Sequence, residues 1–263
     1  MDLFKYCAWS GSAGSHTRDN LRDSAIYLSR PDSFNDPFEF NPVVDIAAED
    51  ETFVKALVKE FQQLHHCSQV EAKRAILEQL KANPRLNTPA ARRETALATK
   101  EYLRRTHGVC CFTTKSDNPA MWAHYADYHQ GVCIHYDFAK NSPVRLPAEK
   151  ESRISVTLRS VTYSEERPIA RFFSPDLAAT MFDSLLTKSP DWSYENEYRM
   201  IAQGYTGKGH YAPDSLVSII IGYRMPPEER EEVRAFSRQL PVPPRLFVAE
   251  INSRKFSYDI RPL

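Results

Sequence analysis

Short segments in which apolar residues run together, or alternate with polar ones, predict β-strands along much of the chain. Two of them, residues 3–8 and 25–29, lie near the N-terminus, and residues 109–114 (VCCFTT) and 131–138 (GVCIHYDF) resume the pattern later. The same reasoning predicts strands at residues 153–163, 198–203, 216–222, 245–251 and 256–260. Strands therefore flank a stretch of the chain that has a different pattern.

That stretch, residues 49–107, has a helical pattern. It contains no glycine, and apolar side chains recur there at the spacing of one helix face, at Phe53, Leu57, Phe61 and Leu64. Further helices are predicted up to about residue 83, over residues 90–105, after Ser15, and over residues 118–127, 175–188 and 226–238. We expect one α+β domain over residues 1–263, with an all-helical insertion at residues 49–107.

Composition narrows the classes of function. The 34 Lys and Arg residues balance the 34 Asp and Glu residues, so the chain lacks the broad positive charge that drives non-specific nucleic-acid binding, although a local basic patch is compatible with this total. The chain has no apolar run of about 18 residues and no secretory leader pattern at its start, so we expect a cytoplasmic protein with no membrane partner.

Glycine is scarce, at 8 residues, which disfavours folds that hold phosphate on glycine-rich loops. Neither GxGxxG before a helix nor GxxxxGK[ST] occurs, and GxSxG is also absent. The five cysteines are expected to be reduced core thiols. His107, Cys110 and Cys111 lie close in sequence, but adjacent cysteines on a strand point to opposite faces, so no metal is expected.

The densest polar segment is KSPDWSYENEYR, residues 188–199, which precedes an apolar strand. If the segment is extended, Glu195, Glu197 and Arg199 face one way, whereas the tyrosines at positions 194 and 198 face the other. Two close carboxylates shift each other's pKa values apart, so one can stay ionised while the other binds and releases a proton. The alternative is a structural ion pair between Arg199 and one of the two carboxylates.

Two further segments carry candidate binding groups. On a helix, Trp122 and Tyr125 are three residues apart and can stack a flat ring or pack in the core, while His124 can orient or protonate a bound group. The loop at residues 29–40 is fixed by prolines and offers Asn35 and Asp36, which either cap the turn or recognise a ribose or an amide. Its phenylalanines at positions 34, 38 and 40 are expected to anchor it.

Four ordered segments resemble the bacterial family catalogued as domain of unknown function 2971. They are LFKY (residues 3–6), YLSRPDSFNDPFE (27–39), CFT with MWAHYAD and a glycine (111–113, 121–127 and 131), and WSYENEYR (192–199). The resemblance spans most of the chain outside the helical insertion. It indicates a family and brings no established reaction with it.

A more distant resemblance implies chemistry. The Glu195-x-Glu197 pair before a strand is similar to the Glu-x-Glu element of ADP-ribosyltransferases, whose fold binds NAD between split mixed or antiparallel sheets without a glycine-rich loop. The likeness implies that Glu197 holds the nicotinamide ribose and that Glu195 activates the acceptor. It implies NAD contacts from Tyr6, Tyr27, Ser29, Asn35, Asp36, Trp122, Tyr125, Trp192 and Arg199. The family's first-strand His or Arg is replaced here by Lys5 and Tyr6.

Three functions follow as hypotheses. The first is NAD-dependent ADP-ribosyl transfer by a toxin or phage-defence effector, with a nucleotide-like ligand and a protein or nucleic-acid acceptor. The second is an acid–base or metal-dependent nuclease that uses Glu195, Glu197, Asp36 and His124. The third is a non-catalytic sensing or interaction domain in which the polar clusters are structural.

Overall fold

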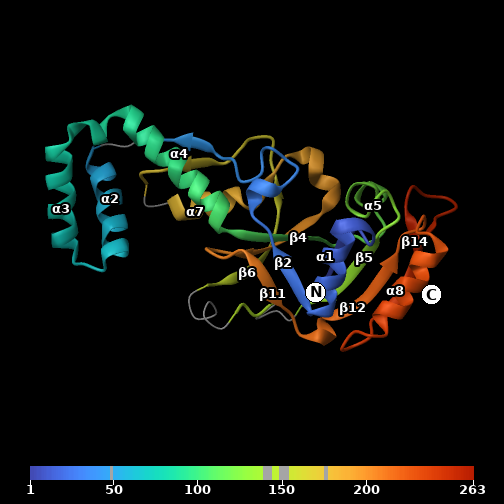
Figure 1. Ribbon diagram of the computed structural model, residues 1–263. Helices are drawn as coiled ribbons and strands as arrows, with labels where there is room; N and C mark the ends of the chain where they lie inside the picture. The colour runs from blue at the N-terminus through green and yellow to red at the C-terminus, as the bar shows by residue number, and fades with distance from the viewer. Residues whose placement is uncertain (48–49, 139–143, 148–153, 175–176) are drawn as a thin grey trace. The chain divides into compact units, whose positions relative to one another are not determined.

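The computed structural model describes residues 1–47, 50–138, 144–147, 154–174 and 177–263 (Figure 1). The chain divides into two compact units, which we describe separately. The sheet unit consists of Met1–Arg30, Thr106–Val161 and Pro190–Leu263. The helical unit consists of Pro31–Arg105 and Thr162–Ser189. The helical unit therefore includes residues 31–45 and 162–189 as well as the helices that were predicted as an insertion over residues 49–107.

The sheet unit is built on an eight-stranded mixed sheet, which confirms the α+β class. The strand order is β14-β13-β12-β5-β1-β4-β10-β6. Only the β12–β13 pair among these neighbours is parallel in the described residues. In chain order the strands are β1 (Asp2–Cys7), β4 (Gly108–Thr113), β5 (Val132–Asp137), β6 (Val156–Ser160), β10 (Glu197–Ala202), β12 (Leu216–Ile221), β13 (Arg245–Ile251) and β14 (Tyr258–Pro262).

A separate two-stranded sheet belongs to the same unit. In it β2 (Ala25–Leu28) pairs with β11 (Gly207–His210). Backbone hydrogen bonds of 2.9 and 2.7 Å join Ser29, just after β2, to Val109 of β4. The strands of the sheet unit are therefore divided between one continuous sheet and one small sheet beside it.

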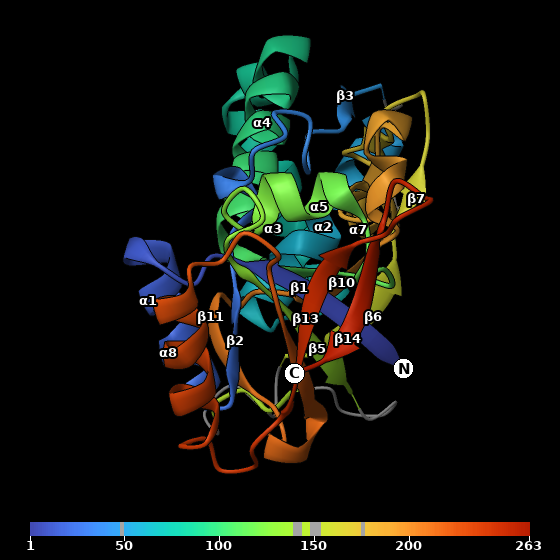
Figure 2. The same ribbon diagram turned by 90° about the vertical axis from the view of Figure 1, so that its right-hand side faces the viewer.

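Apolar side chains cover both faces of the large sheet. On one face Leu3 and Met200 pack in a cluster with residues of α1 (Gly11–Arg22) and α8 (Pro227–Ser237), two helices that lie side by side in Figure 2. On the other face Tyr6 and Cys133 pack against α5 (Pro119–Tyr125). Neighbouring strand residues point to opposite faces, which explains why Leu3 and Tyr6 belong to different clusters.

The helical unit contains α2 (Asp50–His65), α3 (Gln69–Ala82), nearly all of α4 (Pro89–Thr106), and α7 (Leu177–Ser184). The first three confirm the helices predicted between residues 49 and 107. A capping box fixes the start of α3, because the Ser68 hydroxyl accepts from the Glu71 amide at 3.3 Å while the Glu71 carboxylate accepts from the Ser68 amide at 3.0 Å.

Some predicted boundaries were wrong. The strand predicted over residues 153–163 is interrupted, because β6 ends at Ser160 and the short strand β7 (Thr162–Tyr163) pairs instead with β9 (Thr187–Lys188). Residues 153, 175 and 176 lie outside the described residues. The helix placed after Ser15 begins at Gly11. No strand was predicted for β11, for β3 (Val43–Asp45) or for β8 (Ile169–Arg171), which pairs with β3.

Within the described parts of the chain, the helices are all too short or too polar to span a bilayer.

Candidate functional site

The polar segment at residues 190–199 is extended only in its second half. Pro190–Glu195 forms a 3₁₀ helix, η3, and Asn196 has a φ of 45°, so the chain turns before β10 begins at Glu197. The predicted alternation from Tyr194 onward is therefore wrong for Glu195, which does not belong to the strand. It is correct for Glu197 and Arg199, which share one face of β10.

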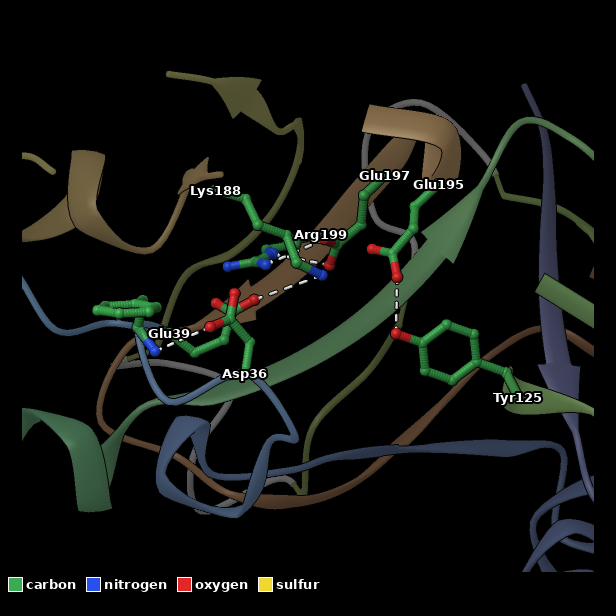
Figure 3. A network of polar contacts seen from close by, with 8 residues as sticks. Asp36, Glu39, Tyr125, Lys188, Glu195, Glu197 and Arg199 are labelled. Carbon is green, nitrogen blue, oxygen red and sulfur yellow. Dashed lines mark hydrogen bonds and ion pairs between the residues drawn. The ribbon is translucent and has the colours of Figure 1, made fainter. Parts of the chain in front are cut away.

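Glu197 and Arg199 form a buried ion pair. The Arg199 Nε and Nη2 groups donate to the two carboxylate oxygens of Glu197 at 2.8 and 3.0 Å, and the two side chains are only 1% and 4% exposed (Figure 3). Such fork-like contacts hold a carboxylate in one orientation. The ion pair proposed as the alternative reading of this segment is thus present, with Glu197 as the partner.

The neighbouring strand places a thiol beside this pair. On β4, Thr113 lies opposite Glu197 and Cys111 lies opposite Arg199. Burial, and next the Glu197 carboxylate, raise the pKa of the Cys111 thiol well above its ordinary value. The thiol is therefore held neutral beside the ion pair.

Glu195 is held by a different partner. The Tyr125 hydroxyl donates to Glu195 Oε1 at 2.6 Å, and Glu195 is 3% exposed (Figure 3). Tyr125 is positioned by the start of α5, where the Asn118 side chain accepts from the Ala120 amide at 2.9 Å and donates to the Tyr194 carbonyl at 2.8 Å. This confirms the predicted helix start and ties α5 to η3. Two carboxylates are thus fixed, two residues apart, by two different elements.

The aromatic residues predicted around this site fall into two groups. Trp122 is fully buried, its Nε1 donates to the Ser116 carbonyl at 2.9 Å, and its ring meets that of Tyr6 edge-on at 5.1 Å. Tyr6 is also buried and donates to the Lys115 carbonyl at 2.9 Å, and its burial raises the pKa of the phenol. Both pack in the core.

The second group lies nearer the solvent. His124 is exposed, and its ring lies 6.4 Å from that of Tyr194, which in turn lies 6.2 Å from the ring of Trp192. Tyr194 and Trp192 are half-buried. These three rings, which we call the ring row, come from α5 and η3, the same two elements that supply Tyr125 and Glu195.

Tyr27 and Ser29 lie elsewhere in the sheet unit. Tyr27 is 51% exposed and pairs with Lys208 of β11. Ser29 pairs with Val109, which lies opposite Ile201, four residues along β10 from Glu197 or about 13 Å at the rise of a strand. The backbone therefore does not bring Ser29 beside Glu197.

Asn35 and Asp36 belong to the helical unit, which has a polar cluster of its own. Asp36 is buried, and its Oδ1 accepts from the Phe38 amide at 2.8 Å. Asp36 therefore caps the turn, which was one of the two roles predicted for it. Asn35 is exposed. The Lys188 ammonium lies 3.6 Å from the Glu39 carboxylate, and both side chains are about 95% or more buried (Figure 3).

Sequence reasoning did not find Lys188 as the partner of Glu39, because about 150 residues separate them and neither has a distinctive neighbour pattern. The anchoring prediction for the loop was correct for Phe40, which is 1% exposed, and wrong for Phe38, which is 58% exposed. Phe38 instead packs under the Arg167 guanidinium, 5.6 Å from the ring centre.

In the part of the chain that the structure describes, no group of three or more His, Cys, Asp or Glu side chains is arranged to hold a metal ion. The metal-dependent form of the nuclease hypothesis thus finds no ligand set among those residues.

Comparison with known proteins supports the family resemblance. The family model described as a protein of unknown function (DUF2971) matches residues 121–200. This range begins with the MWAHYAD segment and ends just after WSYENEYR, so it contains most of α5, all of η3 and the Glu195–Arg199 cluster. The match covers less than half of the chain, and over this range the sequence is similar to the family. No curated protein and no solved structure matched it.

Proposed function

We propose that this protein is an NAD-dependent ADP-ribosyltransferase-like enzyme whose reacting groups are Glu195 and Glu197. The observation that carries the proposal is the pair of buried carboxylates two residues apart, one held by Tyr125 at 2.6 Å and the other by Arg199 at 2.8 and 3.0 Å. Their partners hold them at fixed positions, and electrostatic catalysis depends on groups that need not reorganise during the reaction.

Cleavage of the bond between nicotinamide and ribose develops positive charge on the ribose. A carboxylate in a site shielded from water stabilises that charge more strongly than one in bulk solvent. Glu197 would accept hydrogen bonds from the ribose hydroxyls and stabilise the oxocarbenium-like transition state. Glu195 would accept the proton of the acceptor, with the Tyr125 hydroxyl holding its carboxylate in place.

Aromatic side chains near the carboxylates could bind the flat rings of NAD. The ring row of His124, Tyr194 and Trp192 has the chemistry to stack a flat ring and is solvent-accessible at His124. Trp122 and Tyr6 would support α5 from the core rather than touch a ligand, because their rings pack against each other and their polar groups donate to backbone carbonyls. NAD itself supplies the ADP-ribosyl group and nicotinamide as leaving group.

The proposal is tested with the purified full chain, a cell lysate as a source of acceptors, and NAD labelled separately on nicotinamide and on the adenylate phosphate. A transferase releases labelled nicotinamide and leaves the phosphate label on macromolecules. Release of nicotinamide with free ADP-ribose would indicate hydrolysis instead of transfer. NAD that stays intact under all acceptor conditions would contradict the proposal and favour a non-catalytic binding role for the same cluster.

A further inference from the structure

We infer that the loop between β13 and β14 is a docking site for single-stranded nucleic acid. The loop, residues 252–257, connects two antiparallel strands of the sheet unit and lies close to α5 in Figure 1. At its tip Arg254, Lys255 and Phe256 are all exposed, and Phe256 is 104% exposed, so its ring contacts nothing else in the protein that shields it from water. A fully exposed phenylalanine is unfavourable in water unless a partner covers it.

The loop is held in one conformation. Asn252 Oδ1 accepts from the amides of Arg254 and Lys255, both at 2.8 Å, and Asn252 Nδ2 donates to Asp259 at 2.7 Å. Beyond the tip, the Tyr258 amide donates to the Asp117 carbonyl at 3.2 Å, just before α5. The tip is therefore presented rigidly, which reduces the entropy lost when a partner binds.

Two positive charges of the tip are available to an anion. Among the described residues, neither Arg254 nor Lys255 has an ion-pair partner, whereas Arg261 on β14 lies 3.0 Å from Glu250 and 3.8 Å from Asp259. Arg261 thus engages Glu250 and Asp259, the two acidic residues on the strands that carry the loop. The tip itself carries a local excess of positive charge.

An exposed aromatic ring that directly follows two cationic residues in the chain matches the chemistry of single-stranded nucleic acid. A base stacks on the ring, and the cations contact the adjacent phosphates. Paired bases in a duplex are not open to such stacking, so single strands are favoured. The zero net charge of the chain is consistent with this local contact, because it excludes only a broad electrostatic surface. The inference does not depend on NAD chemistry.

The test measures binding of the full chain to a fluorescent single-stranded oligonucleotide of about 12 nucleotides, by anisotropy. Phe256→Ala and Phe256→Leu should each weaken binding about tenfold, whereas Phe256→Trp should retain it, because only an aromatic ring stacks a base. Arg254→Ala with Lys255→Ala should lower the slope of log affinity against log salt by about 1.4, the value for two phosphate contacts on a single strand.

The matched control removes the same charges elsewhere. Lys81→Ala with Arg85→Ala, at exposed positions of the helical unit, should leave affinity and salt slope unchanged. Equal binding by the wild-type chain and Phe256→Ala would overturn the inference, as would an equal loss in the charge control. Binding to phosphatidylserine vesicles but not to the oligonucleotide would also overturn the inference. If the Phe256→Leu variant still binds the vesicles, the loop would be assigned to a membrane surface.

Discussion

At the scale of single residues, the site consists of two carboxylates with unlike partners. Glu197 is paired with a guanidinium that is 1% exposed, and Glu195 accepts from a phenol. A buried charge that loses its partner is strongly destabilising, so each contact matters for folding as well as for chemistry. Variants of these residues must therefore be examined for stability before their activity is interpreted.

Tyr125→Phe removes the hydroxyl that donates to Glu195 and leaves the rest of the ring. Because Glu195 is 3% exposed, water cannot readily replace that donor, and the free energy of unfolding should fall by about 2 kcal/mol. Urea denaturation measures this difference. The control is Tyr128→Phe at a side chain that is 72% exposed, where a change of less than about 0.5 kcal/mol is expected. Equal stability of the two variants would show that the Glu195 contact contributes nothing.

The cysteines should differ in reactivity. Burial raises the pKa of the thiols of Cys7, Cys110, Cys111 and Cys133 above the ordinary value. Since only the thiolate reacts, a raised pKa lowers the reactive fraction at any given pH near 8. A disulfide reagent should therefore label Cys67, which is half-buried in the helical unit, faster than the other four.

In denaturant all five thiols should react at similar rates, and Cys67→Ser should remove the fast phase of the folded protein. Fast labelling of two or more thiols in that variant would contradict the raised pKa values of the other four.

The candidate residues were only partly predictable from the sequence. The period of two in a strand placed Glu197 and Arg199 on one face, and an ion pair of Arg199 with Glu195 or Glu197 was predicted as the alternative reading; the structure shows Glu197 as the partner. Glu195 was misplaced because PDWSYE folds as a 3₁₀ helix and Asn196 takes a positive φ, neither of which hydrophobic periodicity reveals. The bond from Tyr125 to Glu195 spans 70 residues and depends on tertiary structure alone.

At the scale of elements, most helices and strands with strong periodicity were correct, including β4, α5, β5 and β12. The missed elements are short and carry weak patterns. β11 has the sequence GKGH, and β3 and β8 are three residues each, so their pairing rather than their composition makes them strands. Val43 pairs with Ile169 across more than 120 residues, a contact that no local pattern encodes.

The connection after α5 is a strained element. Asp127, Tyr128 and His129 all have positive φ values, of 46°, 51° and 73°. The turn is held by a hydrogen bond between Tyr258 and His129 Nδ1 at 2.8 Å and by the Arg224 amide, which donates to the His129 carbonyl at 3.1 Å. Each such residue costs about 1–2 kcal/mol relative to glycine, so these contacts offset a local penalty.

Tyr128→Gly should accordingly raise the free energy of unfolding by about 0.5–1 kcal/mol, because relief of the left-handed strain exceeds the entropic cost of glycine. The same change in a helix, Tyr102→Gly in α4, should lower it by about 1 kcal/mol. Both side chains are more than half exposed, at 72% and 66%, so lost packing contributes little. Denaturation of the two variants in parallel checks the opposite signs, and a destabilised Tyr128→Gly would contradict the account of the turn.

At the scale of the whole molecule, the sequence predicted one domain with an inserted helical block, and the chain divides into two compact units that each use more than one segment. The helical unit includes residues 162–189, which come after β6 of the sheet unit in the chain. Units made of distant chain segments depend on pairing between those segments, such as that of β3 with β8. The low glycine content disfavours a glycine-rich phosphate-binding loop, and the proposed site is accordingly built from carboxylates and aromatic rings.

The most direct test of the central claim compares nicotinamide release from NAD by the wild-type chain and two matched variants. Glu197→Gln should lower the rate by about 10²–10³-fold, the usual effect of removing one preorganised electrostatic group. Glu250→Gln, which breaks an exposed pair with Arg261 at 3.0 Å on the same sheet, should leave the rate unchanged. Melting temperatures of both variants separate lost chemistry from lost folding. A well-folded Glu197→Gln variant that releases nicotinamide at the wild-type rate would contradict the claim.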